Sequence, residues 1–144
     1  MLVNQPWLMW ALLSAVFAAM TAVFAKVGLS GVDSDQATWV RTLFIAVVLG
    51  AFLVWTGKWR ASWQFGGKTW LFLALSALAT GASWVCYFRA LQLGNAAQVA
   101  PVDKFSVVLV AVLAVVFLGE RLNLREWVGI ALVTAGVVVL AIKR

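Results

Sequence analysis

The sequence contains no histidine and a single cysteine among its 144 residues. A disulfide within the chain is therefore excluded, as is a metal site built from His and Cys. Cys86 lies in an apolar run, where we expect it to be a small packing residue. Because the chain also lacks a Ser–base pair, we expect neither an enzyme nor a bound metal or cofactor.

Charged residues are scarce as well, at 11% of the chain, whereas hydrophobic residues make up 65%. A soluble globular domain is about a quarter charged and about half apolar. With several long apolar runs, this balance predicts an all-α membrane protein. No polar segment is long enough for a second, soluble domain, so we expect one transmembrane domain over residues 1–144.

Acidic residues are the rarer charged type, with five Asp and Glu against 11 Lys and Arg, for a net charge of +6. In a soluble protein this surplus would suggest nucleic acid as a partner. Here the basic residues flank apolar runs, so the anionic headgroups of membrane lipids account for most of them. No basic run or stacking motif supports nucleic-acid binding, and we expect none.

Five apolar segments are long enough to cross a bilayer core, which needs about 20 helical residues. They cover residues 6–25, 39–56, 69–91, 97–118 and 124–142. The first lacks the basic start of a secretory signal and is too long for its apolar region, so we expect it to be retained. Five spans put the termini on opposite faces, with five basic residues on one face and six on the other. The positive-inside rule therefore barely orients the chain, and insertion in both orientations is an open hypothesis.

Polar side chains form stripes on two of these segments. Ser76, Thr80, Ser83 and Tyr87 recur at the spacing of one helix face, and Ser14 belongs to a similar stripe on the first segment. Single Ser and Thr residues often bond their own i−4 carbonyls and merely permit close packing. We interpret the two complete stripes as the lining of a shared cavity. Its predicted lining residues are Ser14, Ser76, Thr80, Ser83, Trp84 and Tyr87.

The last segment carries Gly129 and Gly136, seven residues apart and so on nearly the same helix face. Small residues at such spacing let two helix backbones approach closely. This face is expected to contact another helix, either within the subunit or between subunits.

Ionisable residues cluster towards one end of the predicted bundle. An ionisable group at the membrane centre costs about 2.5–3.5 kcal/mol, so such residues usually face protein or a watery cavity. Asp103 and Arg89 flank the turn between the third and fourth segments, so the geometry allows an ion pair between them. Lys104 is rotated about 100° from Asp103 on a helix and should point elsewhere. The residues expected to bind charge or act in gating are Lys26, Arg41, Arg89, Asp103 and Lys104.

Two interpretations of Asp103 compete. In the first, Pro101 is the first residue of the fourth helix, and Asp103 lies in its first turn, where a carboxylate suits the helix dipole. In the second, the helix starts near Ala97 and Pro101 interrupts it, which exposes polar backbone beside Asp103 and Lys104. Transporters tend to bind their cargo at broken helices of this kind. Because cations surround Asp103 in either case, we expect it to be ionised.

The second half of the chain carries recognisable motifs: "RALQLG", a fourth span containing proline, "LGERL" at Leu118–Leu122, and "W-x-G" followed by a glycine-rich last span. With these, the chain resembles the EamA domain of the drug/metabolite transporter superfamily over essentially its whole length. The resemblance implies five transmembrane helices forming one EamA-type repeat. It also favours the second interpretation of Asp103.

Typical members of that superfamily carry two repeats of opposite topology, with the substrate cavity between them. A half-size member with one repeat implies a second, inverted copy or a paralogous half-size partner. More distantly, the last span resembles that of the small multidrug resistance pumps, which implies that Gly129 and Gly136 lie at a dimer interface. Those pumps need a glutamate midway along the first helix, and Ala18–Ala22 holds no acid here. The basic residues instead favour an anionic, zwitterionic or neutral solute.

The resulting hypothesis is a secondary transporter of a small organic solute or metabolite. It would work by alternating access as an inverted homodimer in the cytoplasmic membrane of a prokaryote. Two alternatives stay open, a non-transporting membrane subunit that stabilises a partner and a half-size flippase for lipid-linked sugars. A cavity open sideways to lipid would favour the flippase, and a stable monomer without a partner would favour the subunit.

Overall fold

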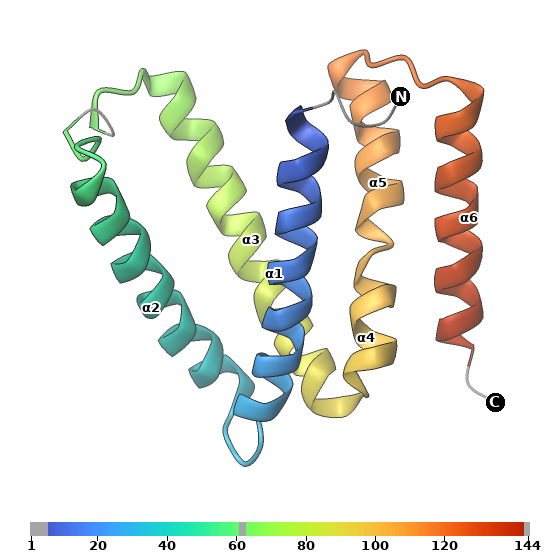
Figure 1. Cartoon of the computed structure of the whole chain (residues 1–144), viewed down its shortest axis with the longest axis horizontal. Coiled ribbons are helices and arrows are strands. Elements are labelled where there is room, and N and C mark those ends of the chain that lie inside the picture. Colours follow the sequence, from blue (N-terminus) through green and yellow to red (C-terminus); the bar gives the residue numbers. More distant parts are fainter. Residues whose placement is uncertain (1–5, 61–62, 143–144) are drawn as a thin grey trace. The chain divides into compact units, whose positions relative to one another are not determined.

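The computed structural model describes residues 6–60 and 63–142 (Figure 1). Its elements are α1 (Pro6–Gly28), α2 (Ser34–Trp55), α3 (Gly67–Leu93), α4 (Ala96–Asp103), α5 (Ser106–Leu113), the π-helix η2 (Ala114–Leu118) and α6 (Leu124–Ala141). Five helical segments are long and apolar enough to cross a membrane, and α4, α5 and η2 together make the fourth. No strand occurs within the described ranges. The predicted all-α fold with five spans is confirmed.

Helices α1, α2 and α3 are longer than the apolar segments that predicted them. Helix α2 begins at Ser34 rather than at residue 39, because the Asp33 carboxylate accepts hydrogen bonds from the backbone N–H groups of Asp35 and Gln36, both 3.0 Å long. Such N-cap bonds satisfy the free donors of a first helical turn. Hydropathy marks the stretch that lies in lipid, whereas the cap marks where the helix begins.

Residue contacts divide the chain into two compact units. The first, which we call the hairpin unit, is Phe24–Leu93. The second, the terminal unit, combines Met1–Val23 with Gly94–Arg144. The single domain expected from the sequence stays a prediction.

The hairpin unit is best packed at one end. Helices α2 and α3 lie side by side there, with the start of α2 beside the end of α3 (Figure 1). The side chains of Leu91 and Phe88 are only 0% and 3% exposed, and Leu29 from the α1–α2 loop is buried with them. Ser34 is buried too, and its carbonyl accepts a 2.7 Å hydrogen bond from the Thr38 hydroxyl. This core holds the polar residues described below in fixed positions.

In the terminal unit, α6 packs against α4 and α5. Val137 is buried and Ile130 and Thr134 are half-buried, and their spacing puts all three on one face of α6. The "LGERL" motif contains Gly119, whose φ of 68° ends η2 in the left-handed conformation that glycine adopts readily. Asn123 and Glu126 then form a capping box that begins α6.

Candidate functional site

The fourth span is interrupted near its first third. Residues 97–100 are helical and Pro101 lies inside α4, so the interpretation with Pro101 as the first helical residue is wrong. Helix α4 ends at Asp103, and α5 resumes at Ser106. At the junction the N–H groups of Lys104 and Phe105 donate to the carbonyls three residues earlier, in bonds of 3.0 Å each. A proline within a helix leaves the i−4 carbonyl without its partner, here that of Ala97.

Two opposite charges lie at this interruption. The Lys104 Nζ is 3.2 Å from Asp103 Oδ2, and both side chains are partly exposed. The expectation that Lys104 points away from Asp103 was therefore wrong. Lys104 is the C-cap of α4 with a ψ of −3°, so the regular helical rotation between neighbours does not apply. The break thus carries a paired carboxylate and ammonium rather than a lone charge.

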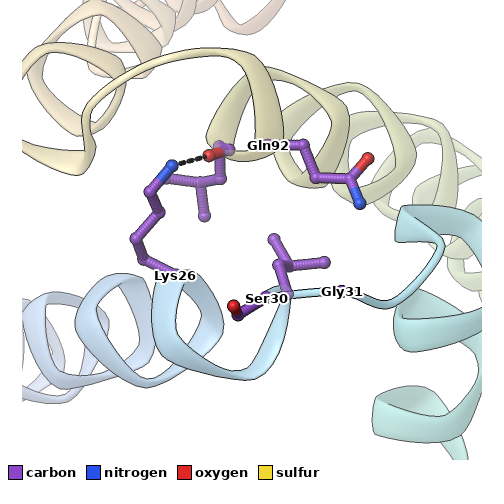
Figure 2. Close-up of a pocket in the computed structure, with 6 residues that line it drawn as sticks. Lys26, Ser30, Gly31 and Gln92 are labelled. Atoms are coloured by element: carbon purple, nitrogen blue, oxygen red, sulfur yellow. Dashed lines mark hydrogen bonds between the residues drawn. The ribbon is translucent and has the colours of Figure 1, made fainter.

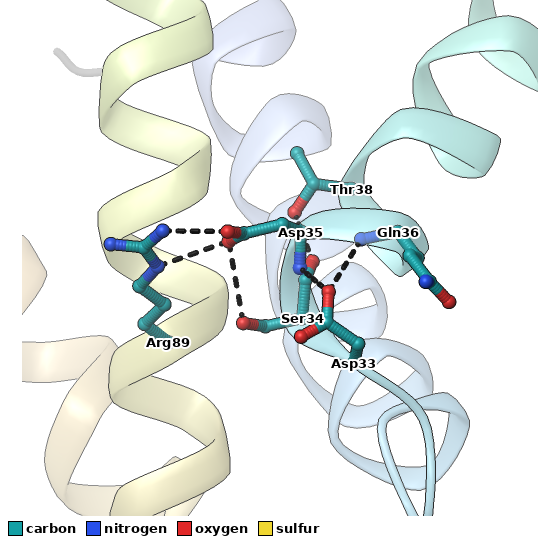
Figure 3. Close-up of polar contacts among 6 residues, drawn as sticks. All are labelled: Asp33, Ser34, Asp35, Gln36, Thr38 and Arg89. Atoms are coloured by element: carbon teal, nitrogen blue, oxygen red, sulfur yellow. Dashed lines mark hydrogen bonds and ion pairs between the residues drawn. The ribbon is translucent and has the colours of Figure 1, made fainter.

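Arg89 on α3 forms a two-pronged ion pair with Asp35 at the start of α2 (Figure 3). Its Nε lies 3.0 Å from Asp35 Oδ1 and one terminal nitrogen 2.6 Å from Oδ2. The carboxylate that pairs with Arg89 is therefore Asp35 and not Asp103, as the sequence had left open. Parallel hydrogen bonds of this kind fix direction as well as distance.

Two further hydrogen bonds connect the same end of the hairpin unit. The Lys26 ammonium donates to the Leu91 carbonyl at 2.5 Å, and the Gln92 amide donates to the Val32 carbonyl at 2.6 Å. Leu91 lies in the last turn of α3, whose carbonyls have no partner further along the helix. The C-terminus of α3 is thus tied both to α1 and to the α1–α2 loop.

A pocket opens beside these bonds, with a volume of about 450 Å³. Figure 2 shows Lys26 reaching from α1 towards α3, with Ser30 and Gly31 of the loop on one side and Gln92 on the other. The residues that line it are Lys26, Leu29, Ser30, Gly31, Leu91 and Gln92.

Arg41 lies further along α2, over the aromatic side chains of α3. Its guanidinium carbon is 4.5 Å from the ring centre of Trp84 and 5.3 Å from that of Phe88. A cation over an aromatic face is attracted by the ring's negative face. Trp84, predicted as a lining residue, therefore supports the guanidinium of Arg41 through its ring face.

The remaining predicted lining residues are distributed along two helices. Ser76, Thr80 and Ser83 are exposed on α3, while Tyr87 is half-buried. The Thr80 hydroxyl donates to the Ser76 carbonyl at 2.8 Å, which is the local bond that the packing interpretation expects. Ser14 is exposed on α1, in the terminal unit. The shared cavity stays a prediction.

The two glycines of α6 face outward. No atom of the described residues lies within 4 Å of the position that a Cβ would take at Gly129 or Gly136. They lie about 100° around the helix from the packed face at Val137. The glycine face is therefore uncovered within the terminal unit.

Several residues of this site were missed from the sequence. Asp35, Asp33 and Gln92 were not predicted to interact, nor was the pocket at Ser30 and Gly31. Asp33 before a helix start is a recognisable N-cap signal, and it would have moved the predicted start of α2 towards Asp35. Nothing in the sequence pattern marks Gln92, whose partner is a backbone carbonyl 60 residues away. Within 6–60 and 63–142, no three His, Cys, Asp or Glu side chains cluster as metal ligands.

An interrupted apolar span with charges at the break, among five helices of the described residues that could cross a membrane, is typical of polytopic α-helical membrane proteins, transporters among them. The profile of the EamA-like transporter family matches residues 5–142, so the chain belongs to this family and is an integral membrane transporter. It is similar to a Sinorhizobium sp. protein named "Uncharacterized transporter in cobO 3'region", with 58% identity over 139 residues. That match covers 96% of this chain and 99% of the relative. No solved structure matches the chain significantly.

Proposed function

We propose that the protein is a secondary transporter that moves a small organic solute or metabolite by alternating access in the cytoplasmic membrane of a prokaryote. The observation that carries this proposal is the broken fourth span, where Pro101 is followed by the Asp103–Lys104 pair. Breaks of this kind supply backbone groups and charge to a solute at the depth of the membrane. They also divide a helix into two halves that can move separately.

The proposed solute pathway is lined by hydroxyl and aromatic side chains. Ser and Thr hydroxyls supply hydrogen bonds without adding charge, and aromatic rings supply flat apolar walls. The residues proposed to line it are Ser14, Ser76, Thr80, Ser83, Trp84 and Tyr87.

The polar links at the end of the hairpin unit are proposed to form a gate. The Arg89 and Asp35 side chains are 59% and 48% exposed, so their ion pair is not enclosed by the hairpin unit and can be broken without moving its buried core. Lys26 and Gln92 bind carbonyls at the C-terminus of α3 and in the loop, and they can exchange those partners for water. A gate made of these polar bonds can open and close without disrupting the apolar core at Leu91.

The functional unit is proposed to be an inverted homodimer, with a paralogous partner as the alternative. The chain supplies five spans, and its relative has nearly the same length. The Gly129–Gly136 face is uncovered and small enough for a second α6 to approach closely. The nearly equal basic charge on the two faces permits both orientations.

Cysteine labelling at both faces tests this arrangement. Asn95→Cys and Gln64→Cys would be made separately in a Cys86→Ala background, since the loops that hold them lie on opposite sides of the membrane. Intact cells would be treated with an impermeant maleimide, before and after permeabilisation. Both cysteines should be labelled to about half in intact cells, because half of the copies point each way.

Labelling of only one position in intact cells would show a single orientation and exclude the inverted homodimer. The alternative paralogous partner would then be required. The Cys86→Ala protein without an added cysteine is the control for background labelling.

A further inference from the structure

Arg41 is a basic residue well inside the second span. It lies about 10 Å along the helix axis from Ser34, at about 1.5 Å per residue. Its side chain is half-buried between α2 and α3. A cation at this depth is costly in a membrane and usually marks a functional position.

The other two basic residues at this end of the hairpin unit, Arg89 and Lys26, already have bonding partners. Arg89 is neutralised by Asp35, and Lys26 binds the Leu91 carbonyl. No carboxylate of the described residues forms an ion pair with Arg41. The two carboxylates of the hairpin unit are engaged elsewhere, since Asp33 caps α2 and Asp35 pairs with Arg89, and the sequence holds no other acidic residue between positions 24 and 93.

The aromatic contacts of Arg41 leave its hydrogen-bonding edge available. Trp84 and Phe88 lie at 4.5 Å and 5.3 Å from the guanidinium carbon and support it through their ring faces. Ring faces do not accept the in-plane N–H bonds of a guanidinium, which form a rigid fork matched to a carboxylate or phosphate.

We propose that Arg41 binds an oxyanion group, a carboxylate or phosphate, of the transported solute, and that the solute is therefore an anion. The aromatic rings of Trp84 and Phe88 hold the guanidinium in place before the solute arrives. The solute supplies the negative charge that the hairpin unit lacks. This inference rests on the proposed transport function and specifies the chemical class of its substrate.

A purely structural role for Arg41 makes a different prediction. If the cation–π contact only joined α2 to α3, replacing Arg41 would lower stability without changing the preference among solutes. Binding of matched probes separates the two roles. Benzoate and inorganic phosphate carry an oxyanion, whereas benzamide has the shape of benzoate without its charge.

The experiment measures binding of these three probes to the purified full-length protein in maltoside micelles, by isothermal titration and by the shift of the unfolding temperature. The wild-type protein should bind benzoate or phosphate and should bind benzamide at least about tenfold more weakly, since a charged hydrogen-bonded pair is lost.

Arg41→Gln should abolish the preference for the oxyanion. Arg41→Lys, which keeps the charge but not the fork, should bind about tenfold more weakly than the wild type. Arg125 is an exposed residue of α6, and Arg125→Gln removes the same charge at another place in the chain. This control variant should bind the three probes as the wild type does.

Three results would overturn the proposal: unchanged oxyanion binding by Arg41→Gln, equal binding of benzoate and benzamide by the wild type, or no binding of either oxyanion. A separate titration with phosphatidylglycerol distinguishes a solute from a lipid. If only this lipid binds in an Arg41-dependent way, Arg41 serves the membrane and the solute proposal is wrong. The cysteine labelling described above does not involve Arg41, so the dimeric transporter and the anionic substrate can fail independently.

Discussion

Two asparagines occupy the same position before a helix, and only one of them uses its side chain. Asn123 Oδ1 accepts a 3.1 Å hydrogen bond from the Glu126 N–H, and Glu126 accepts a 2.6 Å bond from the Asn123 N–H. Asn95, which begins α4, makes no such side-chain bond. At the residue scale, the same residue type therefore contributes differently, since only Asn123 accepts a hydrogen bond from the backbone N–H three positions later.

This pair of asparagines gives a matched test. Asn123→Ala should destabilise the protein by about 1 kcal/mol, the usual cost of a lost N-cap. Asn95→Ala should change stability by much less. The measurement is the unfolding temperature and the denaturant midpoint of both variants in the same detergent. An equal loss in both would show that the capping box does not stabilise α6.

At the scale of the elements, the fourth span is the one that departs from a regular helix. Pro101 removes one backbone donor, the tight turn at Lys104 and Phe105 follows, and η2 widens the helix further along. The sequence predicted a transmembrane segment here but left open whether Pro101 begins its helix or interrupts it. The residue at which the helix begins distinguishes these two interpretations. The start at Ala96 shows that the proline lies within the helix.

Removing the proline should restore a regular helix. Pro101→Ala adds an N–H that can reach the Ala97 carbonyl, and it should stabilise the protein by up to about 3 kcal/mol. Amide hydrogen exchange at residues 101–105 should slow accordingly. Pro6→Ala is the control, because Pro6 begins α1, where a missing donor costs little. Unchanged exchange in Pro101→Ala would mean that the turn, and not the proline, sets the break.

At the scale of the whole molecule, most large apolar side chains are exposed in a single chain. Lipid covers such surfaces in a membrane, and a second subunit can cover part of them. The uncovered glycine face of α6 is the part best suited to a close helix contact. The assembly is therefore decided by surfaces that one chain cannot bury by itself.

Leucine substitutions test this surface. Gly129→Leu and Gly136→Leu should weaken dimerisation by at least about tenfold, because a large side chain separates two helices that pack through small residues. Each subunit should still fold, since no described atom meets the added Cβ. Ala131→Leu, on the opposite flank of α6 and also exposed, is the control. Association would be measured by cross-linking and by particle mass in detergent, and wild-type association in both glycine variants would exclude this interface.

Several residues of the candidate site were predicted from sequence patterns within a single helix. The polar stripe from Ser76 to Tyr87 was predicted on one face, and the charged residues were predicted towards one end. The partner of Arg89 was not, because Asp35 lies 54 residues away and an ion pair depends on how α2 meets α3. The Arg41 contact with Trp84 was missed for the same reason.

The sequence by itself determined the membrane class, the five spans and the family, because hydropathy and local motifs depend only on neighbouring residues. It left open whether Pro101 begins the fourth helix or interrupts it, since a missing N–H costs nothing at the first helical position and breaks a hydrogen bond further in. Only the tertiary structure decided that the helix begins before the proline, that Lys104 bonds Asp103, and that Arg89 pairs with Asp35. These outcomes depend on where separate helices meet, because a side chain can bond only to groups that the packing of the backbone places within its reach.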